Sequence, residues 1–227
     1  MTNIIQKQID AYRDNFIKHG NTPLGTFQNN TATQFERFNQ LIEPLLAHKA
    51  SDFTLCDVGS GVCDLHKFLN ARQIKHEYTG IEIVQEMIDS AKLEMPHLRL
   101  LNQDILADDF NEKFDFCVLS GTFNIPGSIA HTDWQSFIFK VIKKMYSLSN
   151  VGIAFNALTT YSTFKADDLF YLDPNQTIDF IQKNISRHCA VYMDSPLYEV
   201  TYVILNPETK RKQFPSAEFD KYFKNRV

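Results

Sequence analysis

The N-terminal part of the chain places its apolar side chains three and four positions apart. Over residues 3–18 this spacing produces the stripe Ile5, Ile9, Tyr12 and Phe16. The stripe predicts an amphipathic helix. A polar segment with Gly20, Pro23 and Gly25 follows, and it predicts a loop over residues 20–31. A second helix is expected after the loop, with an apolar face made of Phe35, Phe38, Leu41, Ile42, Leu45 and Leu46.

From residue 52 onward, short apolar runs alternate with segments of helical spacing. The runs predict strands at 53–59, 76–83, 97–106, 114–121, 152–158, 187–193 and 199–205. The segments between the earlier strands predict helices at 64–73, 84–95 and 133–145. Thr132 is the expected N-cap of the third of these helices. Asp173 followed by Pro174 predicts a further helix, because a capping side chain before proline is the favoured order at a helix start.

This alternation of strands and helices predicts the fold class. Strands linked by helices form a parallel sheet with helices on both faces. The last two strands have no helix between them, so we expect them to pair as an antiparallel hairpin. The prediction is an α/β fold with a doubly wound, mostly parallel seven-stranded sheet and one antiparallel strand at its end. We expect an N-terminal helical lid over 1–32, one α/β domain over 33–207 and a C-terminal tail over 208–227.

The composition argues against a nucleic-acid partner. The 227 residues carry a formal net charge of -4, whereas a protein that holds nucleic acid by its backbone usually shows a basic excess. The basic residues near the C-terminus are Lys210, Arg211, Lys212, Lys221, Lys224 and Arg226. We interpret them as part of a solvated tail.

The expected location is the cytoplasm, without a membrane partner. The N-terminus lacks a signal-peptide pattern, and no run approaches the roughly 18 apolar residues of a membrane span. The four cysteines form no CxxC pair, which fits a reducing compartment and predicts no metal site. The sequence leaves the oligomeric state open.

The strongest candidate for chemistry is the segment DVGSGVCDLHKFL at residues 57–69. Glycines at a strand-to-helix turn let the backbone pass close to a ligand, and the helix start offers free N–H groups. Here Gly59 and Gly61 follow Asp57, directly after an apolar strand. A dinucleotide enzyme is disfavoured, because Asp64 occupies the last glycine position of its GxGxxG motif and a carboxylate there opposes a pyrophosphate.

Two further acids stand at predicted strand ends. Glu82 lies 25 positions after Asp57, where a carboxylate can accept both hydroxyls of a ribose. Asp104 ends the third strand, where it can meet an adenine amino group while Ile105 packs on the ring. An exposed glutamate and a turn aspartate are the alternative interpretations. The glycine turn upstream favours the ligand-binding interpretation for Glu82.

Together these residues make the sequence resemble the class I S-adenosylmethionine-dependent methyltransferases over about residues 35–205. The family motif acid-x-G-x-G-x-G is matched by Asp57, Gly59 and Gly61, whereas Cys63 stands where the third glycine usually lies. The resemblance implies a Rossmann-like domain with S-adenosylmethionine as cofactor. The cofactor-binding residues that we assign are Arg37, Asp57, Gly59, Ser60, Gly61, Glu82, Ile83, Asp104, Ile105 and Ser120.

Three expectations concern the rest of the site. Arg37 can reach the carboxylate of the cofactor, or it can lie in solvent. His131 precedes the helix after the fourth strand and is the candidate general base, with a structural residue at a helix start as the alternative. Residues 1–30 are expected to form a mobile lid over the acceptor and not over the glycine turn. Tyr12 in this lid either lines the acceptor pocket or packs in the core.

The predicted function is methyl transfer to an O, N or C nucleophile of a small molecule, with release of S-adenosylhomocysteine. An RNA methyltransferase that uses the basic tail is one alternative. A non-catalytic protein that binds S-adenosylmethionine on the same fold is another, because a fold does not fix a function.

Overall fold

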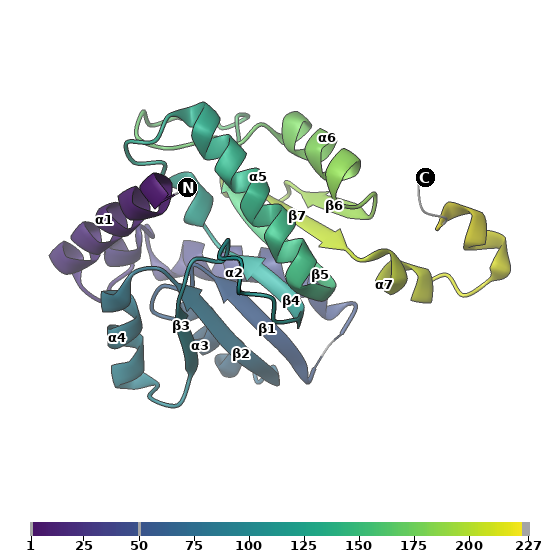
Figure 1. The fold of residues 1–227 in the computed structure, drawn as a ribbon, viewed down its shortest axis with the longest axis horizontal. Coiled ribbons are helices and arrows are strands. Elements are labelled where there is room, and N and C mark those ends of the chain that lie inside the picture. Colours follow the sequence, from purple (N-terminus) through teal and green to yellow (C-terminus); the bar gives the residue numbers. More distant parts are fainter. Residues whose placement is uncertain (1, 50, 224–227) are drawn as a thin grey trace.

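A single twisted sheet forms the centre of the computed structural model, which describes residues 2–49 and 51–223 (Figure 1). Its seven strands lie in the order β3-β2-β1-β4-β5-β7-β6. They are β1 Phe53–Val58, β2 His76–Glu82, β3 Arg99–Asn102, β4 Phe114–Leu119, β5 Ser149–Leu158, β6 Cys189–Tyr192 and β7 Glu199–Leu205. β7 runs antiparallel to both β5 and β6, and the other neighbouring strands pair in parallel. The predicted sheet with one antiparallel strand is therefore confirmed.

Helices cover both faces of the sheet (Figure 1). The α-helices are α1 Thr2–His19, α2 Thr31–Leu46, α3 Asp64–Ala71, α4 Gln85–Glu94, α5 His131–Leu148, α6 Pro174–Asn184 and α7 Pro207–Lys212. Three short 3-10 helices are η1 Leu24–Thr26, η2 Thr122–Asn124 and η3 Ala217–Tyr222. Apolar residues of α2, α3 and α4 pack on one face of the sheet, and those of α5 and α6 pack on the other. The expected boundary between residues 32 and 33 lies in the first turn of α2.

Three details differ from the sequence-based expectation. The reversed strand β7 lies one place inside the edge, because β6 pairs along its outer side. β5 begins at Ser149, before the predicted start at residue 152. Thr132 is not a cap, since α5 already begins at His131 and Ala130 is its N-cap without a side-chain hydrogen bond.

The predicted helix start at Asp173 is confirmed, because its carboxylate accepts hydrogen bonds from the backbone N–H groups of Asn175 and Gln176 at 2.8 and 3.0 Å.

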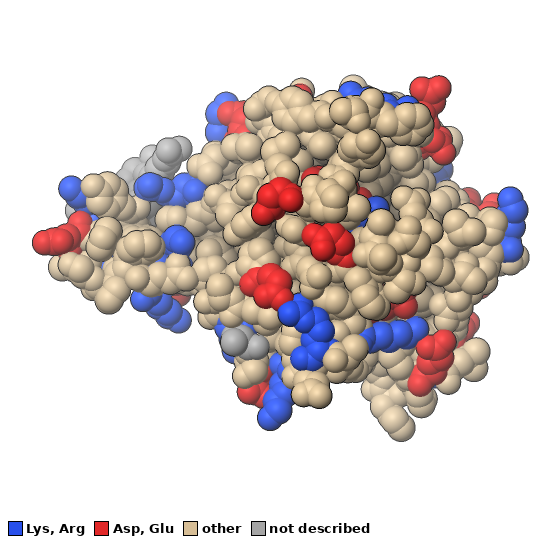
Figure 2. All heavy atoms as spheres, turned by 180° about the vertical axis from the view of Figure 1, so that it is seen from behind, with Lys and Arg blue, Asp and Glu red and all other residues tan. Residues whose placement is uncertain are grey.

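The C-terminal segment extends away from the sheet as α7 and η3 (Figure 1). One of its cations, Arg211, is paired with Asp220, and Lys224 and Arg226 lie outside the described residues. Figure 2 shows acidic and basic side chains scattered over the rear face, without one continuous basic patch. Within residues 2–49 and 51–223, no helix is both long and apolar enough to span a bilayer.

Candidate functional site

A cavity lies at the carboxyl ends of β1, β2 and β4. Its wall includes the turn after β1, the end of β2 and the segment after β4. The strand order reverses between β1 and β4, and open α/β sheets bind their ligands at such a switch point. The empty space at this site, including the part open to solvent, is about 1080 Å³.

Left-handed backbone shapes the turn after β1. Gly59 and Gly61 have φ angles of +71° and +53°, a region that costs an L-residue with a side chain about 1–2 kcal/mol. A Cβ on Gly59 would lie 2.5 Å from the Oγ1 of Thr122. The segment after β4 can approach this turn only because Gly59 has no side chain.

Cys63 shares the left-handed conformation, with φ of +63°. Glycine, which the family motif has at this place, adopts this conformation without strain. Its side chain is nevertheless fully buried and packs among apolar residues of the α2–α3 face. A cysteine in place of the motif glycine therefore adds backbone strain and also adds buried packing contacts.

We expect Cys63→Gly to change the free energy of unfolding by no more than about 1 kcal/mol, because relief of strain offsets the lost packing. Urea unfolding of the variant measures this difference. Its affinity for S-adenosylhomocysteine should stay within about tenfold, or ~1.4 kcal/mol. Loss of binding by a folded variant would show that the thiol itself is required.

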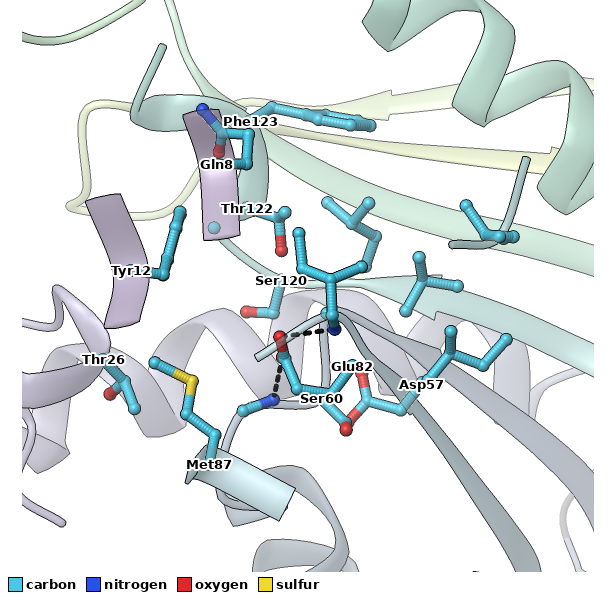
Figure 3. Close-up of a pocket in the computed structure, with 18 of the residues that line it drawn as sticks. Gln8, Tyr12, Thr26, Asp57, Ser60, Glu82, Met87, Ser120, Thr122 and Phe123 are labelled. Carbon is cyan, nitrogen blue, oxygen red and sulfur yellow. Dashed lines mark hydrogen bonds between the residues drawn. The ribbon is translucent and has the colours of Figure 1, made fainter. Parts of the chain in front are cut away.

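Glu82 is held by the turn that it faces. Its Oε2 accepts a hydrogen bond from the N–H of Gly61 at 2.8 Å, and its Oε1 accepts from Ile83 and Val84 at 2.8 and 2.9 Å. Burial raises the pKa of the carboxyl, and these N–H groups oppose that rise. Oε1 thus accepts two N–H groups, whereas Oε2 accepts one and keeps a second lone-pair direction free. A fixed carboxylate of this kind can accept a hydroxyl donor from the cavity (Figure 3).

Asp57 lies deeper, at the end of β1. The hydroxyl of Tyr78 donates to its Oδ2 at 2.6 Å. Burial raises the pKa of Asp57 to about 7, and the nearby Glu82 adds to the rise, whereas the Tyr78 hydrogen bond opposes it. This carboxyl therefore changes charge near neutral pH.

The other predicted cofactor residues lie around the same cavity. Asp104 and Ile105 form its wall after β3, where the Oδ1 of Asp104 accepts from the N–H of Leu106 at 2.9 Å. Ile83 also lines the wall, as do Ser60 and Ser120. Both serine hydroxyls are buried and have no hydrogen-bond partner among the described residues. The Oγ of Ser60 lies 2.7 Å from the place of a Cβ on Gly80, so it faces β2.

Two predicted residues lie outside the cavity lining. Arg37 is only 10% exposed, and its Nε donates to Glu199 at 2.7 and 2.9 Å. The guanidinium is therefore paired with a buried carboxylate, and its Nη1 donates to the side chain of Gln28, which lines the cavity. His131 is an exposed residue in the first turn of α5, with its ring edge-on to Phe170 at 5.3 Å. Neither position supports the role that the sequence suggested.

The N-terminal segment, which consists of α1, η1 and the loop after η1, covers one side of the cavity. It contributes Ile5, Gln8, Tyr12, Thr26 and Gln28 to the lining, and Figure 3 shows Gln8 and Tyr12 of α1 on the same side of the cavity as Thr122. The segment also covers the glycine turn. Thr26 has a methyl group 3.6 Å from the place of a Cβ on Gly61, and Phe16 packs in a cluster with Val62, Val84 and Met87. The expectation that this segment avoids the glycine turn is wrong, because its apolar face is buried there.

Sequence reasoning also missed part of the wall on the opposite side. Trp134 and Phe137 line the cavity, although their spacing in the predicted helix at 133–145 indicates only a face buried in the core. These side chains belong both to the core and to the cavity wall. Trp134 is fully buried, and its Nε1 donates to the carbonyl oxygen of Phe123 at 2.9 Å. The described residues contain no group of three or more side chains suited to a metal ion.

Known proteins resemble this chain in sequence and in fold. No family model matches it. The protein named "Putative methyltransferase Rv1506c" from Mycobacterium tuberculosis (strain ATCC 25618 / H37Rv) is 32% identical over 161 residues, which cover 70% of this chain and 96% of that protein.

Two solved structures show how far the fold is shared. The N-methyltransferase NodS from Bradyrhizobium japonicum WM9, in complex with S-adenosyl-L-homocysteine, has a TM-score of 0.63 and 13% identity, with 88% of this chain and 99% of NodS covered. The magnesium protoporphyrin IX methyltransferase from Synechocystis PCC 6803 with bound SAM has a TM-score of 0.59 and 13% identity, with 87% and 97% covered. These likenesses establish the fold.

Proposed function

The chain belongs to the methyltransferases, and we propose that it transfers the methyl group of S-adenosylmethionine to a small molecule. The observation that carries the proposal is the bond between Glu82 and the N–H of Gly61. It joins the ribose-type carboxylate to the glycine turn inside one cavity. The relative from Mycobacterium tuberculosis supports the reaction class, and the solved structures support the cofactor through the ligands that they hold.

The residues of the cavity fit this cofactor. The place of a Cβ on Gly61 has only the Thr26 methyl group near it, at 3.6 Å, and Oε2 of Glu82 retains a free lone-pair direction. Ser120 has a buried hydroxyl without a partner among the described residues. A ligand with ribose hydroxyls and an ammonium group offers partners for such groups.

Each residue then has a proposed task. Glu82 accepts a ribose hydroxyl at its Oε2, Asp104 meets the adenine amino group, and Ile83 and Ile105 pack beside the base. Asp57 compensates the ammonium of the methionine part. When bound, S-adenosylmethionine supplies a methyl group activated by its sulfonium. The protein contributes alignment and the exclusion of water, through the roof formed by α1.

The electrostatic role of Asp57 predicts a pH dependence. Its carboxyl is protonated and neutral below its pKa of about 7, and a cationic ligand favours the ionised form. The affinity for S-adenosylhomocysteine should therefore rise as the pH increases toward about 7 and level off above it. Binding near pH 6.5 should release a proton. Calorimetry in two buffers of different ionisation enthalpy measures that release.

Asp57→Asn provides the control, because its amide oxygen still accepts from Tyr78. We expect weaker binding at pH 8 and no rise between about pH 6 and 8 in this variant. An unchanged pH dependence would assign the titration to another group.

The proposed function is tested by ligand binding and by transfer. We expect S-adenosylhomocysteine to bind and NAD not to bind, since Asp64 lies at the start of α3 where a pyrophosphate would need N–H groups. Labelled S-adenosylmethionine should pass its methyl group to a component of a metabolite mixture. Binding of NAD alone would overturn the proposal.

The two alternatives have distinct signatures. An RNA methyltransferase would bind RNA with strong salt dependence. The scattered charge of Figure 2 and the Arg211–Asp220 pair do not favour it. A non-catalytic protein would bind S-adenosylhomocysteine and methylate nothing in the mixture. We place the protein in the cytoplasm, as the cysteine pattern suggests.

A further inference from the structure

The charged side chains that line the cavity all have the same sign within the described part of the chain. They are Asp57, Asp64, Glu82 and Asp104. Arg37 does not alter this, because it is outside the lining and paired with buried Glu199. An acidic acceptor would therefore be buried without a cation beside it. Burying an unpaired carboxylate costs several kcal/mol.

The part of the wall that comes from the N-terminal segment and from η2 is uncharged. It is built from α1, η1 with the loop that follows it, and η2, and comprises Ile5, Gln8, Tyr12, Thr26, Gln28, Thr122 and Phe123. Burial in such surroundings disfavours a charged ligand, and it lowers the pKa of an enclosed amine. A neutral ligand therefore fits this half of the cavity best.

The four carboxylates are poorly placed to deprotonate an acceptor. Asp57 accepts from the Tyr78 hydroxyl, and Asp104 accepts from the backbone of its own turn. Asp64 accepts from the Nε2 of Gln34 at 3.0 Å, and Glu82 accepts the backbone N–H groups described above. An alcohol needs a positioned base before it attacks. A neutral amine needs none, because its nitrogen already carries a free lone pair.

Two hydroxyl groups lie where an amine could be held. Figure 3 shows the Ser120 oxygen on the side of Tyr12 and Thr26, and the Thr122 oxygen directed toward Ser120. The Oγ of Ser120 is buried and unpartnered among the described residues. A hydroxyl can accept an N–H and leave the nitrogen lone pair free.

Building on the proposed function, we propose that the acceptor is a neutral amine on an apolar frame, held by Ser120 and Thr122 beneath α1. The nitrogen lone pair forms the new N–CH₃ bond as the C–S bond breaks, and the electrons of that bond go to sulfur. The ammonium product gives its extra proton to water. The uncharged roof selects against acidic acceptors.

Trp134 provides the readout for the test, because it is the single tryptophan and it lines the cavity. S-adenosylhomocysteine is titrated first by tryptophan fluorescence, and failure to bind would overturn the proposed function itself. The complex is then titrated at pH 8 with aniline and with benzoate, which share a ring and differ in charge. We expect aniline to bind at least about tenfold more tightly. Equal or tighter binding of benzoate, or no binding of aniline, would overturn the assignment of an amine.

A second measurement identifies the methylated atom. The protein is incubated with a metabolite extract and S-adenosylmethionine carrying a ¹³C-methyl group, and the product is examined by NMR. The methyl group is expected on nitrogen. A methyl ether or a methyl ester as product would contradict the proposal.

Gln8→Lys tests the selection by charge. The side chain of Gln8 is in the roof, and its Nε2 donates to the carbonyl oxygen of Ile125 at 3.0 Å. A lysine there supplies the missing cation, so benzoate should gain affinity relative to aniline in a variant that still binds S-adenosylhomocysteine. Ile5→Lys in the same helix makes the same test should Gln8→Lys fail to fold. An unaltered ratio in the folded variant would show that the roof does not set the charge of the acceptor.

Discussion

Replacement of Glu82 by alanine is expected to weaken the binding of S-adenosylhomocysteine by about 2–4 kcal/mol, or roughly 30- to 900-fold. A charge-assisted hydrogen bond to a ribose hydroxyl, together with the order that the carboxylate gives the turn, accounts for that range. The substitution also leaves the N–H groups of Gly61, Ile83 and Val84 without their acceptor. The glycine turn should therefore lose order as well as a ligand contact. Calorimetry gives the affinity, and circular dichroism reports whether the fold survives.

Two controls separate these effects. Glu86→Ala removes an exposed carboxylate from the first turn of α4, and it should leave the affinity unchanged. Glu82→Gln keeps one acceptor oxygen but turns an NH₂ group toward backbone donors, so binding should fall to an intermediate level. Full affinity in Glu82→Ala would mean that the carboxylate serves only the turn.

The sequence predicted the parts of the molecule where pattern and chemistry are local. Strand and helix periodicity identified the sheet, since each element must present an apolar face to the core. The glycine turn was recognisable because Gly59 and Gly61 adopt left-handed backbone next to a strand end. Glu82 and Asp104 followed from the rule that the carboxyl ends of parallel strands share one edge.

Residues whose position depends on distant partners were placed less well. Arg37 lies on the predicted helix, but its direction is set by Glu199, which is 162 positions away in the chain. No local spacing reveals such a pair. The same holds for Gln8 and Thr26, which reach the cavity only because the N-terminal segment folds back over the strand ends. Trp134 was assigned to the core, and periodicity does not distinguish a core side chain from one that also forms a cavity wall.

The roof itself can be opened by one substitution. Phe16 is 7% exposed and packs against Val62, Val84 and Met87, which adjoin the glycine turn and the start of α4. Replacing a buried phenylalanine with alanine costs about 3–5 kcal/mol. Phe16 belongs to this small cluster and not to the two larger ones on the sheet faces. The loss should therefore act mainly on closure of the N-terminal segment, and the sheet should stay folded.

We accordingly expect Phe16→Ala to raise the dissociation constant of S-adenosylhomocysteine by at least about tenfold, because apparent affinity falls with the fraction of closed protein. Dissociation should also become faster, as Trp134 fluorescence would show in a displacement experiment. Ile17→Ala is the matched control, since Ile17 is adjacent to Phe16 in α1 but its side chain is 68% exposed. Equal affinities in both variants would mean that α1 covers the acceptor alone. Deletion of residues 1–20 should then leave cofactor affinity intact, whereas the packing of Phe16 predicts that the deletion weakens it.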